Sequence, residues 1–484
     1  MIRMKVIKLI ACVFCLIFLM SSLFTASAFD PYEAYTYDEW EKGIPAAVGY
    51  GATDTYSGDL ENQVFIDTPQ DMYIDDNGMI YILNSGMKSV IILNNDLSLV
   101  REIKTFVNAD GSEQSLMLPK GICVDNELIY IADYDAQCVV VSDLYGNVKN
   151  IISKPENPVF PQEKEFQPYA VSVDGQGNLY ILANNIYQGA LVYTPELKFK
   201  DFFGGNKIKP TVSLLADRFW QSILSSEADE NFSNYVPAVP TNMDITKEGF
   251  LYTCSYTNTY DNSNVRCVTP AGKELFLIYG DMEVGVRKFS TLDTQFADIA
   301  ISDSEYIYAL DTTKYRIFVF DTEQSLIFTF GANGSQKGAF SNPVAIETYK
   351  DNVYVLDASK GCVTVFEPTE YGKAVLESLE YYEDGKYDES VEGWKQVLRL
   401  NANEQLAYNG IGKALLYNGE YEEARGYFKR AANREDESRA FEMYRNNLMR
   451  ENSALILILI VALVVVIIAI KYVVKTIKKR RCRA

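Results

Sequence analysis

The clearest indication of the fold comes from residues 118–141, LPKGICVDNELIYIADYDAQCVVV. This stretch holds three short runs rich in β-branched and apolar residues, Leu118–Asp125, Leu128–Asp133 and Cys138–Val141, and turn-forming residues separate them. Runs of this length and composition are typical of β-strands joined by tight turns. A looser fourth strand is expected around Lys149–Ile152. The stretch therefore predicts one small antiparallel sheet of four strands.

The same pattern recurs six times along the chain. A tyrosine in the second strand marks each copy: Tyr81, Tyr130, Tyr180, Tyr252, Tyr308 and Tyr354. A proline stands 11 or 12 residues before five of them, and Phe296 takes its place in the remaining copy; the prolines are Pro69, Pro119, Pro168, Pro240 and Pro343. A four-stranded repeat with this spacing is typical of β-propeller blades. The chain is therefore predicted to be mainly β, with a six-bladed β-propeller over residues 29–369.

The six copies resemble NHL repeats from about residue 44 to residue 367. The resemblance rests on the proline, on a second strand such as Tyr130-Ile131-Ala132-Asp133, and on the hydrophobic third strand. It is weaker in the fourth copy, where Thr253-Cys254-Ser255 replaces the usual ending. Propellers of this family commonly serve as recognition modules, so the resemblance implies a binding role, although a fold does not by itself name a function.

The sixth copy ends at Phe366 without an outer strand of its own. Upstream of the first copy, Ala46–Gly51 resembles the fourth strand of other copies, such as Phe328–Gly331. An unpaired sheet edge invites aggregation. We therefore expect the N-terminal segment to complete the sixth blade and close the ring.

From Tyr371 onward the hydrophobic period becomes helical, and two copies align at an offset of 34 residues. The matched pairs are Gly385 and Gly419, Tyr387 and Tyr421, Trp394 and Phe428, and Val397 and Ala431. These copies resemble tetratricopeptide repeats over residues 370–450. The first copy departs from the family pattern, because Ser378 stands in place of a glycine and Ser390 in place of an alanine. A helix at Glu437–Arg450 is expected to cap them. An ordinary helical hairpin that acts as a stalk is the alternative.

Two apolar segments predict how the chain relates to a membrane. Residues 1–28 have the basic, apolar and small-residue regions of a signal peptide, with Ala26-Ser27-Ala28 before the cleavage site. The second segment, 453–474, is long enough to span a bilayer, and the basic tail 475–484 follows it. The positive-inside rule places this tail in the cytoplasm. The prediction is a single-pass protein of the cell membrane with its large N-terminal domain outside. A buried core helix is the alternative for the second segment.

Charge and cysteine content indicate which partners the protein can bind and whether its cysteines form disulfides. The two ends of the chain hold ten of the 45 basic residues and none of the 65 acidic ones, which leaves a net charge of −30 between them. Such a domain repels nucleic acids. Five cysteines fall in the same part, and free buried thiols are favoured because no disulfide spacing is evident. Pairing of Cys254 with Cys267, or of Cys123 with Cys138, stays open.

The chain contains no histidine. This excludes histidine-based triads and histidine zinc sites, and leaves oxygen ligands for Ca²⁺ or Mg²⁺. Asp71, Asn242 and Asp298 stand at the same position of three copies, at the channel-facing start of the inner strand. This set is similar in kind to the metal site of gluconolactonase-type propellers. Ordinary strand-end roles are the favoured alternative, and structural roles in turns are also expected for Asn84, Asp133, Asp311 and Asp357.

Two elaborations are predicted on one face of the ring. The wide spacing before Tyr252 indicates an insertion at 207–237, in which residues 213–225 have helical periodicity. The fourth copy also has a long loop at 256–263. A ligand-binding face is predicted from these two segments. The alternative is that both are surface loops that have varied in sequence without a binding role. Its candidate residues are Phe219, Trp220, Tyr256, Tyr260 and Asp261.

Together these features favour a membrane-anchored extracellular binding or scaffold protein. Its propeller would present one face to a protein or glycan, and its helical repeats would contact a partner in or near the membrane. A divalent-metal hydrolase of the gluconolactonase type is the alternative, with Ca²⁺ or Mg²⁺ as cofactor. The binding reading implies neither a cofactor nor catalysis.

Overall fold

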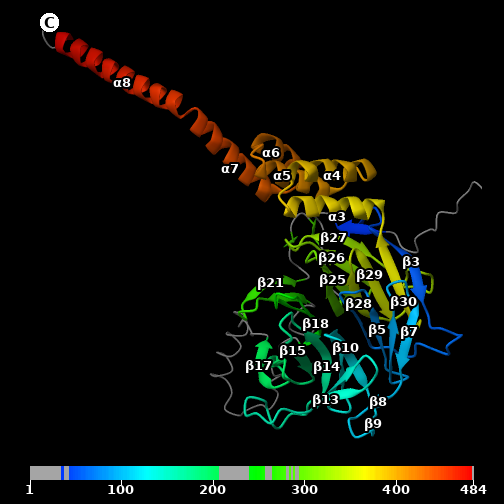
Figure 1. Cartoon of the computed structure of the whole chain (residues 1–484). Helices are drawn as coiled ribbons and strands as arrows, with labels where there is room; N and C mark the ends of the chain where they lie inside the picture. The colour runs from blue at the N-terminus through cyan, green and yellow to red at the C-terminus, as the bar shows by residue number, and fades with distance from the viewer. Residues whose placement is uncertain are drawn as a thin grey trace, which may run out of the picture.

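The structure is a computed structural model, and it shows a ring of β-sheets followed by a stack of helices (Figure 1). It describes residues 34–37, 43–205, 239–256, 264–279, 283–284, 287–288 and 294–481. The predicted signal peptide and the predicted helix at 213–225 lie outside these residues. Phe219, Trp220, Tyr260 and Asp261 also lie outside them.

Six four-stranded antiparallel sheets form the blades of a β-propeller, so the predicted fold class is confirmed. Blades 1 to 3 consist of β4 (Asp71–Ile74), β5 (Ile80–Asn84), β6 (Ser89–Leu93) and β7 (Leu99–Ile103); β10 (Pro119–Asp125), β11 (Leu128–Asp133), β12 (Cys138–Asp143) and β13 (Val148–Ile152); and β14 (Pro168–Val173), β15 (Leu179–Ala183), β16 (Gly189–Tyr193) and β17 (Phe199–Gly204). Blades 4 and 5 consist of β18 (Pro240–Ile245), β19 (Leu251–Ser255), β20 (Asn264–Val268) and β21 (Glu274–Tyr279); and β24 (Phe296–Ile301), β25 (Ile307–Asp311), β26 (Arg316–Phe320) and β27 (Leu326–Phe330).

Blade 6 contains β28 (Pro343–Tyr349), β29 (Asn352–Asp357), β30 (Cys362–Pro368) and, as its outer strand, β3 (Tyr50–Tyr56). Two-residue and three-residue strands form small hairpins elsewhere: β1 (Tyr35–Tyr37) with β2 (Gly43–Pro45), β8 (Phe106–Val107) with β9 (Glu113–Gln114), and β22 (Glu283–Val284) with β23 (Arg287–Lys288).

The N-terminal strand closes the ring as predicted, but its bounds differ from the prediction. β3 lies antiparallel to β30, from Tyr50 opposite Pro368 to Tyr56 opposite Val363 (Figure 1). The predicted strand was Ala46–Gly51, whereas residues 46–49 precede β3. The carbonyl groups of Val48 and Gly49 accept hydrogen bonds from Thr369 at the start of the first helix, and these bonds hold the segment outside the sheet.

The repeated tyrosines lie between blades and are at most 8% exposed. Tyr81 of blade 1, for example, belongs to the same core cluster as Ile122 and Ile131 of blade 2. Burying an aromatic side chain of this size is strongly favourable. The repeat that marks the sequence therefore marks the packing between neighbouring blades.

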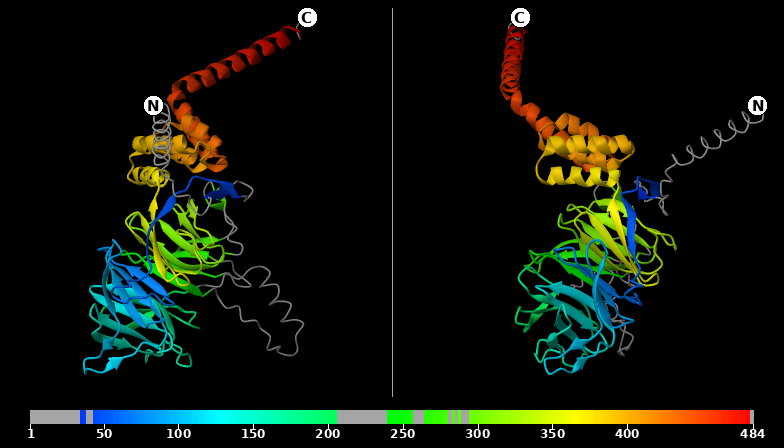
Figure 2. Two further views of the ribbon diagram at one scale, coloured as in Figure 1. Left: turned by 90° about the vertical axis from the view of Figure 1, so that its right-hand side faces the viewer. Right: turned by 45° about the vertical axis from the view of Figure 1, so that its right-hand side comes forward.

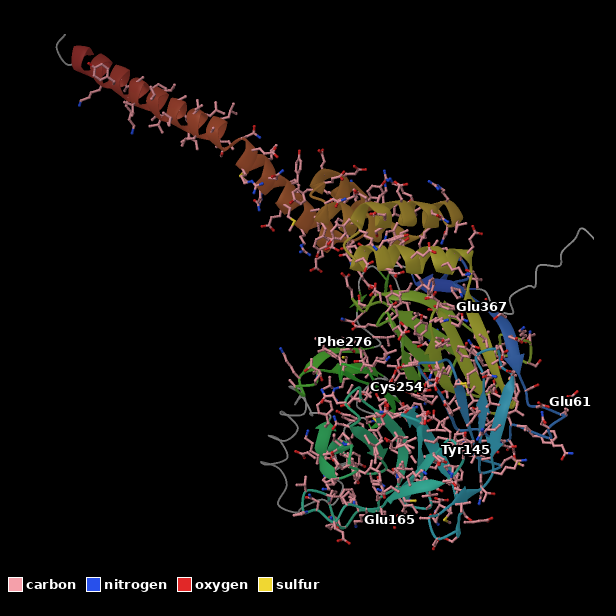
Figure 3. All side chains as sticks on the ribbon, in the orientation of Figure 1. Glu61, Tyr145, Glu165, Cys254, Phe276 and Glu367 are labelled. Carbon is pink, nitrogen blue, oxygen red and sulfur yellow. The ribbon has the colours of Figure 1, made fainter. Side chains whose placement is uncertain are left out.

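The five cysteines of the propeller are buried and free, as predicted. In blade 4 the register places Cys254 opposite Val265 and Cys267 opposite Tyr252, so these two thiols do not face each other across the strands. Cys254, labelled in Figure 3, is buried in the apolar core that blades 4 and 5 share.

The polar residues three positions after four of the tyrosines have the structural role that was predicted for them. Each ends its second strand and accepts hydrogen bonds from backbone N–H groups of the chain that enters the same blade. The pairs are Asn84 with Asp67, Asp133 with Met117 and Leu118, Asp311 with Gln295, and Asp357 with Ser341 and Asn342.

Six helices follow the propeller: α3 (Glu370–Glu383), α4 (Tyr387–Leu400), α5 (Gln405–Tyr417), α6 (Tyr421–Arg430), α7 (Arg434–Glu451) and α8 (Ser453–Arg481). The 34-residue offset is visible in the helical pairs, because Gly385 and Gly419 both end a helix at positive φ and Trp394 and Phe428 are both buried. Their assignment to the tetratricopeptide family stays a prediction. We call α3 to α7 the helical unit.

The last helix, α8, contains an apolar stretch, Ser453–Tyr472, that is long enough to cross a membrane. Its mean hydropathy is 3.5 and none of it is buried against the rest of the protein. Only Asn452 separates it from α7. In both views of Figure 2, α8 projects away from the propeller.

Candidate binding face and central channel

The topology of the blades defines one face of the propeller, which we call the loop face. In an antiparallel sheet with the order 1-2-3-4, the turn between strands 2 and 3 lies at the same edge as the start of strand 1 and the end of strand 4. All these turns and the connections between blades therefore emerge on one side of the ring. The helical unit contacts a turn of the other kind, β26–β27, so its described contacts leave the loop face uncovered.

Large apolar side chains are exposed on the loop face around blade 1. Phe65 is 51% exposed, Met87 48% and Met117 58%. Hydrogen bonds bring their segments together, because Asn84 donates to the Phe65 carbonyl and Ser85 donates to the Pro119 carbonyl. Leu60, Val159, Tyr187 and Tyr256 are also exposed on connections or turns of this face.

The opposite side of the ring offers a useful comparison. Tyr145, labelled in Figure 3, lies in the turn between β12 and β13 and is 71% exposed. The Arg101 guanidinium lies 4.3 Å from the centre of its ring. This tyrosine is thus partly covered by its own chain, whereas no such cation is recorded over Phe65 among the described residues.

Of the predicted ligand-binding residues, Tyr256 falls within the described part of the chain. It directly follows β19, is 44% exposed, and forms an isolated β-bridge with Gln295 at the entry to blade 5. Partial burial raises the pKa of its hydroxyl, and the nearby Cys254 and Asp298 add to this effect. Tyr256 therefore stands where the loop face meets the central channel.

The predicted metal residues lie on the inner strands, and the structure brings two of them into contact. Asn242 Nδ2 donates to Asp298 Oδ1 at 2.5 Å. The same carboxylate accepts from the N–H of Ile299, at 2.8 Å, and from the N–H of Ile346 in the next blade, at 2.7 Å. Both oxygens of Asp298 therefore already have backbone donors.

Asp71 makes the same contacts between blades 1 and 2. It accepts from the N–H of Met72 at 3.0 Å and from the N–H of Ile122 at 2.8 Å. A third carboxylate, Asp244, joins blades 4 and 5 in this way through Ile245 and Ile301. We call this arrangement the blade clasp: one inner-strand carboxylate bonds to its own strand and to the next blade.

Four carboxyl groups face the channel, and the sequence prediction named only two of them. They are Asp71, Asp244, Asp298 and Glu347. Glu347 and Asp244 stand two positions further along their strands than the predicted set, on the same side of the sheet. A reading of the inner strands with a period of two could have found them.

The protein environment keeps these groups from ionising easily. Burial raises the pKa of Asp244 to about 6. Burial also raises the pKa of Glu347 well above its usual range, and Asp244, Asp298 and Asp71 raise it further. Like charges in a poorly solvated site disfavour the charged form. Asp244 and Glu347 keep some accessible surface, as residues that line a narrow channel do.

The chemistry available in the channel is limited. Among the described residues, no group of three or more histidine, cysteine, aspartate or glutamate side chains is arranged to hold a metal ion. Cys123 is buried at the same level, and burial raises the pKa of its thiol well above the usual value, so it is a poor nucleophile. The metal site at Asp71, Asn242 and Asp298 stays a prediction.

Comparison with known proteins adds little. No protein-family model matches the chain, and no curated protein does. Among solved structures, virginiamycin B lyase from Staphylococcus aureus is 11% identical, with 66% of this chain and 99% of that chain covered and a TM-score of 0.40. A protein of unknown function from Bacteroides thetaiotaomicron is 12% identical, with 70% and 90% covered and a TM-score of 0.41. Likenesses this weak carry no argument about function.

Proposed function

We propose that this chain is a membrane-anchored binding protein that holds a rigid propeller at the cell surface and presents the loop face to a protein ligand. The observation that carries the proposal is the exposed apolar group Phe65, Met87 and Met117 on a face that the helical unit leaves uncovered. Binding sites are commonly built from loops on a rigid scaffold.

The chemistry of this group favours a protein over a glycan as the ligand. Methionine and aromatic side chains are enriched at protein–protein interfaces, and methionine adapts its shape to different partners. The net charge of −30 between the two ends of the chain argues against nucleic acid.

Anchoring is proposed from the apolar stretch of α8 and from the basic residues at the C-terminal end of the same helix. Its apolar stretch meets the length that a bilayer requires. Basic residues at the C-terminal end favour a cytoplasmic tail, and this places the propeller outside. The helical unit would then set the distance and orientation of the propeller above the membrane.

The metal-dependent hydrolase is the weaker candidate. It needs Asp71, Asn242 and Asp298 to bind a cation, but both oxygens of each aspartate already accept backbone hydrogen bonds. A cation there would compete with the blade clasps.

Affinity capture with matched variants tests the proposal. The full-length protein is extracted from membranes in mild detergent, as wild type, as Phe65→Ser with Met117→Ser, and as Tyr145→Ser. We expect the loop-face variant to lose a partner that the wild type and Tyr145→Ser both retain, while all three unfold at similar temperatures. Loss in Tyr145→Ser alone would contradict the proposal.

A further inference from the structure

The joint between the propeller and the helical unit is built around one turn of blade 5. This turn, Asp321–Ser325, connects β26 and β27 and lies against α3 and α5. Thr322 Oγ1 donates to Glu383 Oε1 of α3 at 2.9 Å. Glu323 forms an ion pair with Lys413 of α5. The propeller thus contacts the helical unit through polar side chains here, next to an apolar core that both parts share.

A cavity of about 30 Å³ lies beneath the turn. Its lining includes Asp321, Glu323, Glu383, Trp394, Asn409 and Lys413. Trp394 is 1% exposed, and no acceptor among the described residues lies within hydrogen-bond distance of its Nε1. The space is large enough for one or two water molecules. The joint is therefore packed loosely enough, and is polar enough, to admit water.

Negative charge exceeds positive charge around this cavity. Asp321 is 5% exposed, and one of its oxygens accepts from the N–H of Ser325 at 2.6 Å. The cation beside it, Lys413, is paired with Glu323. The other titratable groups around Asp321 are Glu323 in its own turn, Glu305 and Tyr306 in the turn before β25, Glu380, Tyr382 and Glu383 in α3, Lys413 in α5, and Asp436 of α7 near Lys413. The helix α4 contributes Trp394, which carries no charge.

We propose that this joint is a proton-sensitive latch, in which a proton on Asp321 holds the β26–β27 turn against the helical unit and loss of that proton loosens it. The geometry supports this because an ionised Asp321 would lie in a nearly closed space with two further carboxylates and one shared lysine. The apolar core of the joint stays in place, so the effect is a local opening of the turn.

The direction of the pH dependence follows from the buried state of the carboxyl group. Burial raises the pKa of Asp321 from 3.8 to about 7. The closed joint therefore holds a proton that the open joint releases, and closing is favoured at low pH. The equilibrium constant for closing falls by at most about tenfold per pH unit between pH 4 and pH 7. Above pH 7 the proton no longer favours the closed joint.

Hydrogen exchange in the full-length protein in detergent tests the latch. Backbone protection of the turn Thr322–Ser325 and of α5 is measured at pH 5.5, 6.5 and 7.5, after correction for the intrinsic exchange rate. We expect wild-type protection to fall by up to about 25-fold across this range. Asp321→Asn should show no such fall, while Asp303→Asn, an exposed acid of the same blade, should behave like the wild type.

Two results would overturn the proposal: protection in the wild type that does not change with pH, or an unchanged pH dependence in Asp321→Asn. If Asp321→Asn does not fold, Glu323→Gln takes its place, because Glu323 is the carboxylate that raises the pKa of Asp321. Removing this neighbouring negative charge should move the loss of protection to lower pH. An unmoved transition would also contradict the latch.

Discussion

The hydroxyl groups of Tyr50 and Tyr308 lie 2.9 Å apart, although 258 residues separate them in the chain. Tyr50 begins β3, the closing strand, and Tyr308 is the repeated tyrosine of blade 5. The ring of Tyr50 also stacks on Phe330, with the ring centres 4.9 Å apart. The N-terminal strand is therefore held by blade 5 as well as by its own blade.

Closure of the ring should depend on this side chain. Tyr50→Ala removes the buried ring and leaves a cavity, which typically costs about 3–5 kcal/mol. Tyr50→Phe loses only the hydroxyl contact and should cost about 1 kcal/mol. Urea unfolding of the full-length protein measures both. Equal stability of Tyr50→Ala and the wild type would mean that the ring closes without β3.

The blade clasp gives a second prediction. Asp298→Ala leaves the N–H groups of Ile299 and Ile346 without their acceptor, and each unsatisfied buried group costs about 1–3 kcal/mol. Asp298→Asn keeps one acceptor oxygen and should therefore lose less stability than Asp298→Ala. Thermal unfolding compares the two variants.

The same variants distinguish the clasp from a metal site. Calcium is added to the wild type and to Asp298→Ala, and the unfolding temperatures are compared. A role confined to the clasp predicts no calcium effect on either protein. A rise in the wild type that disappears in Asp298→Ala would instead indicate a bound cation.

Glu347 should make the propeller less stable as the pH rises. Its folded-state pKa lies well above the usual value, so the folded protein keeps a proton that the unfolded chain releases. The associated stability is present at low pH and is lost as the pH rises toward the folded-state pKa. Glu347→Gln should therefore match the wild type at low pH, near 4, and be more stable than the wild type at pH 8. A difference that does not change with pH would contradict this.

Membrane topology can be tested directly. Protease added to intact cells should degrade the propeller and leave a fragment of a few kilodaltons, because only the residues after about Ile470 are predicted to be cytoplasmic. Full protection of the propeller in cells, with cleavage after lysis, would reverse the orientation.

The sequence is informative about the blades because each blade repeats the same burial pattern around its tyrosine. It is less informative where the environment comes from distant segments. The bounds of β3 depend on Thr369, more than 300 residues away, which binds the carbonyl groups just before the strand. A period of two along the inner strands points to Asp244 and Glu347 as candidates, but their closeness to each other appears only once the inner strands of several blades meet around one channel. The contact between Glu323 and Lys413 has no local signal at all.

Site-specific photocrosslinking shows directly whether the loop face binds a protein ligand. A benzophenone side chain is placed at Met87, at Met117 or, as the control, at Tyr145, and intact membranes are irradiated. We expect a discrete, protease-sensitive adduct from Met87 and Met117 and none from Tyr145. An adduct from Tyr145 with none from the two methionine positions would contradict this expectation.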